Sequence, residues 1–194
     1  MLFRSFVIFL TVTPVAARLG KVRAAIMFTV LSALFVVASY ALRLLGVMPG
    51  PGSSLLLPVF LALNTTGTAL GIGAMIVGAS MMSDIVEASE ETTGRREEGL
   101  FFSGALFMQK CASGLGILVT GLILQAAAFP DGAVSGAVPE AVINRLTLLF
   151  ILATLILSGV SALIFRSFPF GEAEHKARVA KLAVAAIKLN TEKG

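Results

Sequence analysis

Long apolar runs alternate with short polar or charged stretches along this chain. The apolar runs lie at residues 24–42, 55–82, 100–124 and 146–165. Each is close to or above the roughly 20 predominantly apolar residues that an α-helix needs to cross a bilayer. A segment in lipid must satisfy its own backbone hydrogen bonds, which favours helices over open strands. The pattern therefore predicts an all-α integral membrane protein with four full transmembrane helices.

The composition supports this prediction. The chain has 194 residues, of which 57% are hydrophobic and only 13% are charged, whereas soluble domains carry about 25% charged residues. The net charge of +4 comes from basic residues at segment ends and in the tail, as membrane topology predicts, and does not indicate nucleic acid binding. A single cysteine excludes an intrachain disulfide and a zinc pattern. We expect no cofactor.

Lys110 stands out because it lies about ten residues into the third apolar run. At about 1.5 Å rise per residue it is roughly 15 Å below the membrane surface, where a charge costs roughly 2.5–3.5 kcal/mol. Its helical face is mostly small or polar, and consists of Ser103, Gly114, Ile117 and Gly121. A lysine that snorkels to the interface is the alternative, but its stem reaches only about one helical turn. We expect Lys110 to face a bundle interior or a water-filled path, with Ser103 and Gly114 on a face where a solute or another helix can come close.

The second apolar run contains polar side chains at Asn64, Thr65 and Thr68. These either line a solute path or form hydrogen bonds with neighbouring helices or with their own backbone. The same run contains Gly67 and Gly71, with Gly78 one heptad further on, and we expect these glycines to form a helix-contact face.

A charged stretch between the second and third runs is predicted to be a loop at Ser83–Gly99. Its charged residues suggest a cytoplasmic gate, in which ion pairs form in one conformation and break in the other. The alternative is a solvated loop, where each pair contributes roughly 0–1 kcal/mol. The gate candidates are Asp84, Glu87, Glu90, Arg96 and Glu98.

This stretch resembles a loop of the glycoside–pentoside–hexuronide:cation symporters, the melibiose-permease-like family of the major facilitator superfamily. That family has D-x-x-D-Y-x-E, then G-x-R-x-E-G, and a lysine twelve residues after the last glutamate. This chain departs from the pattern with Glu87 in place of Asp and Ala88 in place of Tyr. The residues that match in register are Asp84, Glu90, Gly94, Arg96, Glu98, Gly99 and Lys110.

The resemblance extends more weakly over nearly the whole chain, as the C-terminal part of such a transporter. It implies that residues 1–17 are a truncated membrane helix, although Arg4, an apolar run and small residues at 15–17 also fit a signal peptide. Residues 18–167 would form the membrane bundle. It also implies that Lys110 lies near the cation and sugar sites and takes part in cation and substrate coupling. The cation-binding acidic residues of the family lie in an N-terminal half that this chain is expected to lack.

Basic residues predict the orientation. The loop at 18–23 contains three, the loop at 83–99 two and the tail from Arg166 six, whereas the intervening loops contain only Arg43 and Arg145. Lys and Arg are enriched on the cytoplasmic side, so we expect the C-terminus to be cytoplasmic in the cell (inner) membrane. Residues 168–194 are amphipathic and either lie on the anionic leaflet or are solvated.

Together with these patterns, the resemblance implies the C-terminal helical bundle of a major-facilitator-type secondary transporter. It would move a sugar or a related glycoside or hexuronide together with Na⁺ or H⁺. Its partners would be membrane lipid, a sugar-like solute and the missing N-terminal half, with no nucleic acid. The alternative is a non-transporting membrane fragment or assembly partner. An enzyme is disfavoured because no acid, base or nucleophile cluster lies at one depth.

Overall fold

The computed structural model describes residues 12–50, 52–95, 97–134 and 136–167. This part of the chain is all helical, and it contains four helices long and apolar enough to cross a membrane. They are α2 (Lys21–Leu44), α3 (Leu56–Thr93), α4 (Glu98–Ala126) and α5 (Glu140–Arg166). A short helical stretch, residues 12–19, precedes α2. The predicted all-α membrane fold is therefore confirmed.

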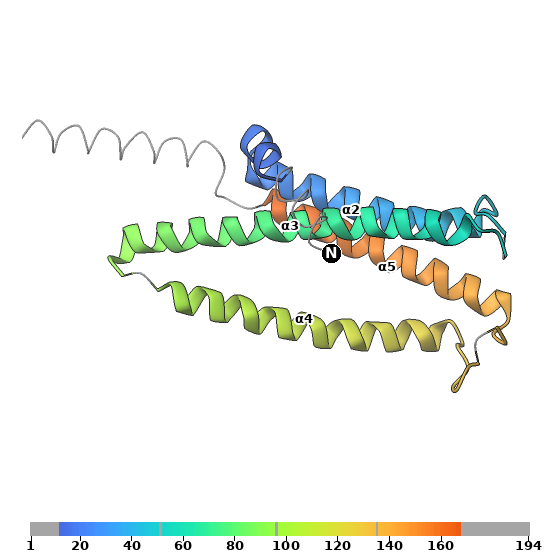
Figure 1. Cartoon of the computed structure of the whole chain (residues 1–194). Coiled ribbons are helices and arrows are strands. Elements are labelled where there is room, and N and C mark those ends of the chain that lie inside the picture. The colour runs from blue at the N-terminus through green and yellow to red at the C-terminus, as the bar shows by residue number, and fades with distance from the viewer. Residues whose placement is uncertain (1–11, 51, 96, 135, 168–194) are drawn as a thin grey trace, which may run out of the picture.

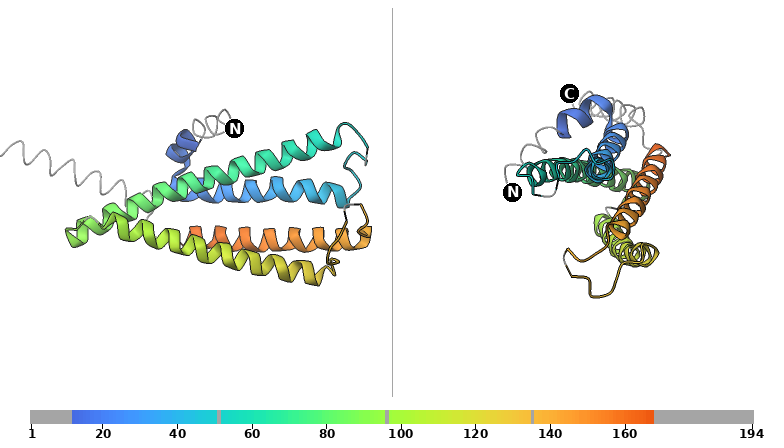
Figure 2. Two further views of the ribbon diagram at one scale, coloured as in Figure 1. Left: turned by 60° about the horizontal axis from the view of Figure 1, so that its bottom comes forward. Right: turned by 90° about the vertical axis from the view of Figure 1, so that its right-hand side faces the viewer.

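The helices α2, α3 and α5 form the packed part of the molecule (Figure 1). A core cluster of Val12, Ala24, Phe28, Val77 and Met81 joins the stretch before α2 to the first half of α2 and the middle of α3. Helix α4 lies on the far side of α5 from α2 and has few contacts with α3 and α5 (Figure 2). None of its residues is buried.

The close approach of α2 and α3 depends on glycine. A Cβ added to Gly67 would lie 2.8 Å from Val36 Cγ2 and 3.1 Å from the carbonyl oxygen of Ser32. The Ser32 hydroxyl in turn donates a hydrogen bond of 2.7 Å to the carbonyl oxygen of Gly67. Small residues allow this proximity of two backbones. The predicted contact face is thus confirmed at Gly67, and also at Gly71, where an added Cβ would lie 3.1 Å from Ser32 Oγ.

The same prediction is not confirmed for Gly78, since a Cβ added there meets nothing within 4 Å among the described residues. Beyond Gly71 the buried positions of α3 are Gly73, Val77, Met81 and Val86. The contact face therefore moves around the helix as α3 extends past α2, and Gly78 falls outside it.

The connection between α3 and α4 is shorter than predicted. We expected a loop over Ser83–Gly99, but α3 continues as a helix through Thr93. The segment 79–93 contains no Gly or Pro to end the helix. Gly94 then adopts a left-handed conformation at φ 69°, and its N–H donates to the carbonyl oxygen of Glu90. Such a glycine is a common helix terminator.

The other boundaries differ by smaller amounts. Helix α2 extends the run predicted at 24–42 by about a turn, and α4 extends the run predicted at 100–124 by two residues at each end. Helix α5 begins at Glu140 instead of near residue 146, directly after Pro139. Of the truncated helix predicted at 1–17, residues 12–17 are helical and 1–11 lie outside the described residues, as does the predicted amphipathic tail at 168–194.

Candidate functional site

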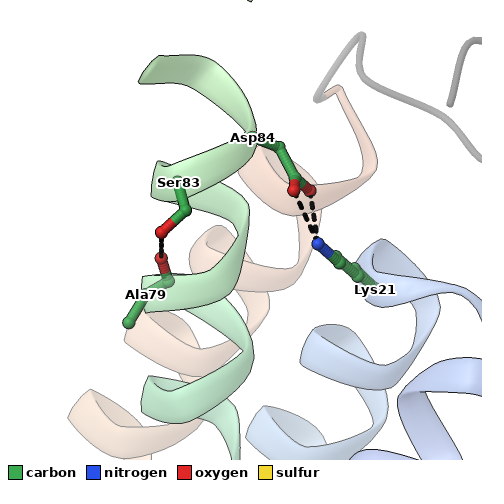
Figure 3. A network of polar contacts seen from close by, with 4 residues as sticks. All are labelled: Lys21, Ala79, Ser83 and Asp84. Carbon is green, nitrogen blue, oxygen red and sulfur yellow. Dashed lines mark hydrogen bonds and ion pairs between the residues drawn. The ribbon is translucent and has the colours of Figure 1, made fainter. Parts of the chain in front are cut away.

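An ion pair joins α2 to α3 at the end of the bundle where α2 begins. The ammonium nitrogen of Lys21 lies 2.7 Å from both carboxylate oxygens of Asp84 (Figure 3). The two side chains are 36% and 28% exposed. Lys21 is the first residue of α2, where the helix dipole disfavours a cation. The Asp84 carboxylate offsets this unfavourable position.

Lys21 was missed as a site residue by the sequence analysis, which counted it only as part of a basic loop. The usable signal was the opposite charge of Lys21 and Asp84, which lie at the ends of two successive apolar runs of the sequence. Neighbouring Ser83 takes no part in the pair, because its hydroxyl bonds to the carbonyl oxygen of Ala79 in its own helix (Figure 3). Asp84, one of the gate candidates, thus has a partner within the packed α2–α3 pair.

The other gate candidates occupy the C-terminal part of α3 and the start of α4. Glu87 is exposed and Glu90 is partly buried, and both lie on the helical extension of α3 beyond Asp84. Glu98 is exposed in the first turn of α4, where the helix dipole favours an anion. Arg96 lies outside the described residues.

Lys110 lies near the middle of α4 and its side chain is exposed. The rest of its stripe is open as well: Ser103 is exposed and bonds to the carbonyl oxygen of Leu100. A Cβ added to Gly114 or Gly121 would meet nothing within 4 Å, and Ile117 is 76% exposed. The described part of the chain therefore leaves this face of α4 free to contact lipid, a solute or another helix.

Two of the three candidate path residues of α3, Asn64 and Thr68, form hydrogen bonds with their own helix. Asn64 Nδ2 donates to the carbonyl oxygen of Phe60 at 3.0 Å, and Thr68 Oγ1 donates to that of Asn64 at 2.8 Å. Asn64 and Thr65 are partly buried and Thr68 is exposed. These bonds agree with the alternative in which the polar side chains form hydrogen bonds with their own backbone. Each side-chain oxygen still has lone pairs that can accept a hydrogen bond from a solute.

The described helices are apolar, and α4, which has no buried residue, contains Lys110 near its middle. An ionisable residue inside a membrane span usually marks an ion or solute pathway. The chain belongs to the MFS/sugar transport protein family, whose model matches residues 1–172. This match confirms the resemblance to the major facilitator superfamily. It covers most of the chain, including all four membrane helices and Lys110.

One relative is an uncharacterized symporter from Synechocystis sp. (strain ATCC 27184 / PCC 6803 / Kazusa). It is 36% identical to this chain over 70 residues, which are 34% of this chain and 13% of the relative. The aligned part is therefore only a small fraction of that symporter's length. No solved structure matches this chain.

Proposed function

We propose that this chain forms the C-terminal helices of a secondary transporter that moves a sugar or a related glycoside or hexuronide together with Na⁺ or H⁺. The observation that carries this proposal is Lys110, an exposed cation midway along an apolar helix of a transporter-family chain. A lysine at that depth is costly in lipid and usually marks an ion or substrate pathway. The relative named as a symporter supports coupling to an ion.

Lys110 has the coupling role in this proposal. Ser103 and Gly114 leave space on its face of α4, and Asn64, Thr65 and Thr68 contribute hydroxyl and amide groups from α3. Polyhydroxylated solutes need such hydrogen-bonding partners in an otherwise apolar pathway. Helices of an N-terminal half would complete the cavity opposite α4 and supply the carboxylate that balances the lysine.

The cytoplasmic gate in this proposal is the C-terminal part of α3 with the start of α4. The Lys21–Asp84 pair holds α3 against α2 at the base of this segment. Glu87, Glu90, Arg96 and Glu98 then form and break ion pairs with groups across the pathway as the transporter changes state. The orientation follows the basic residues, with Lys21 and Arg166 at the cytoplasmic end in the cell (inner) membrane.

Uptake driven by separate ion gradients tests this function. The complete gene product that contains this chain is reconstituted in vesicles, and a Na⁺ or a H⁺ gradient is imposed over a panel of glycosides and hexuronides. We expect accumulation of one solute class under one of the two gradients. Absence of uptake under both gradients, with correct insertion, would contradict symport and favour a non-transporting membrane protein or assembly partner.

A further inference from the structure

A pocket of about 590 Å³ lies at the end of the bundle opposite the Lys21–Asp84 pair. It is formed where α2 ends and α3 and α5 begin, together with the connection between α2 and α3 (Figure 1). The side chains that matter for its chemistry are Arg43, Glu140, Asn144, Leu56, Leu57 and Phe60. The pocket is far along the helices from Lys110, so it is separate from the proposed coupling site.

The two charged residues of the pocket have opposite signs and do not pair with each other. Within the described residues the ion pair found is that of Lys21 and Asp84, and Arg43 and Glu140 are both exposed. Each charge is favourable at its own helix end, since Arg43 is in the last turn of α2 and Glu140 in the first turn of α5. Helix-end placement does not explain why both side chains line one pocket. A ligand with an anionic and a cationic group would complement these two charges.

The apolar part of the pocket suits a molecule that is anchored in the membrane. Leu57 is 66% exposed and, with Leu56 and Phe60, forms an apolar wall. Phe60 packs edge-on against Tyr40, with ring centroids 5.7 Å apart, and Tyr40 also contacts Phe150 of α5 at 4.9 Å. This aromatic contact between three helices supports the wall from behind. The pocket thus has charged groups at a helix end and an apolar side toward the span, which is the polarity profile of a lipid headgroup region.

We infer that this pocket binds the headgroup of a phospholipid that carries a phosphate and a primary ammonium. The Arg43 guanidinium donates paired hydrogen bonds to the phosphate, a geometry that guanidinium groups match well. The Glu140 carboxylate and the Asn144 carbonyl oxygen accept hydrogen bonds from the ammonium. A choline group cannot donate these bonds, and a glycerol headgroup has no cation for Glu140. The first acyl carbons lie along Leu56, Leu57 and Phe60.

Lipid binding to the purified full chain tests this inference without any transport assay. The chain is delipidated in detergent and titrated with phosphatidylethanolamine, phosphatidylglycerol and phosphatidylcholine of identical acyl chains, and bound lipid is counted by native mass spectrometry. We expect phosphatidylethanolamine to bind about tenfold more tightly than the other two, the difference typical of one charge-assisted hydrogen-bond set. Because the chain has one Tyr and no Trp, emission from Tyr40 gives a second readout next to Phe60.

Two variants test the roles of Arg43 and Glu140 in lipid binding separately. Arg43→Gln should weaken binding of phosphatidylethanolamine and phosphatidylglycerol alike, whereas Glu140→Gln should reduce phosphatidylethanolamine to the level of phosphatidylglycerol. Arg145→Gln is the matched control, because Arg145 is an exposed cation on α5 that does not line the pocket. Circular dichroism verifies that each variant keeps its helix content.

Two outcomes would overturn the inference. The first is equal binding of the three lipids, or an equal effect of Arg145→Gln and Arg43→Gln, which would mean general attraction to charged lipid. The second is displacement of the lipid by soluble glycerophosphoethanolamine at equal concentration, which would make a free solute the ligand of the pocket.

Discussion

The α2–α3 pair and helix α4 are both apolar helical segments with glycines and charged residues, yet they use these residues in opposite ways. In the pair, Gly67 brings two backbones together and Asp84 binds Lys21. On α4, a Cβ added to Gly114 would meet nothing within 4 Å, and Lys110 is exposed. The comparison shows that the type of residue alone does not determine the role of a glycine or a charged side chain in a membrane helix. What it does depends on whether a second helix of the described chain lies opposite.

The largest expected effect concerns Lys110. We predict that Lys110→Met in the complete gene product lowers gradient-driven uptake by roughly 10–100-fold, the loss expected for a charged hydrogen bond or ion pair in a solute path. The amount of inserted protein should not fall, because removing a charge from the middle of a span favours insertion. Uptake into vesicles and quantification of inserted protein measure the two effects.

Cys111→Met is the matched control, since Cys111 is the adjacent residue on α4 and is also exposed. It should leave uptake unchanged. Equal uptake by the Lys110→Met variant and the parent would remove the lysine from the mechanism and leave it as a tolerated polar residue.

A smaller effect is expected on stability at Gly67. We predict that Gly67→Ala destabilises the chain by about 1–3 kcal/mol, because the new methyl group meets the side chain of Val36 and the backbone of Ser32. Gly78→Ala and Gly114→Ala should instead be neutral or stabilise by up to about 1 kcal/mol, as alanine favours helix and meets no neighbour there. Unfolding in detergent, followed by circular dichroism, gives the three values. If Gly67→Ala changes the free energy of unfolding no more than Gly78→Ala and Gly114→Ala do, the close contact at Gly67 has no energetic consequence.

The smallest effect is expected for the Lys21–Asp84 pair. Because both side chains are about a third exposed, the pair contributes at most about 1 kcal/mol to stability. A double-mutant cycle with Lys21→Met and Asp84→Asn measures this coupling, and Arg23→Met, an exposed cation in the same first turn, serves as the control. If Asp84→Asn reduces uptake far more than it reduces stability, the pair acts in the conformational cycle. Parallel losses would make it a brace between two helices.

Sequence analysis was sufficient for the features that repeat along one helix. It predicted the four apolar helices and the contact at Gly67 and Gly71, because length, hydropathy and glycine spacing are properties of one segment. It was wrong about residues 83–93, since a dense charge pattern was interpreted as a loop although the local residues favour helix up to Gly94.

It did not find the features that need two or more segments. The partner of Asp84, the contacts of Tyr40 with Phe60 and Phe150, and the pocket between Arg43 and Glu140 each depend on which faces of separate helices meet. A helical period gives the residues that share a face but not the direction in which that face points. The loss of contact at Gly78 has the same origin, because the crossing of α2 and α3 decides where their shared face ends.

The length of α3 has a mechanical consequence. Its 38 residues correspond to about 57 Å at 1.5 Å per residue, well beyond the roughly 30 Å of a hydrocarbon core. The Lys21–Asp84 pair still holds α3 against α2 at Asp84, and Gly94 lies roughly 15 Å beyond Asp84 along the helix axis. A bend of about 15° at this point would displace Gly94, and with it the start of α4, by roughly 4 Å. The part of α3 beyond Asp84 is thus an arm, in which a bend at the edge of the packed helices becomes a movement of several ångströms at the charged end.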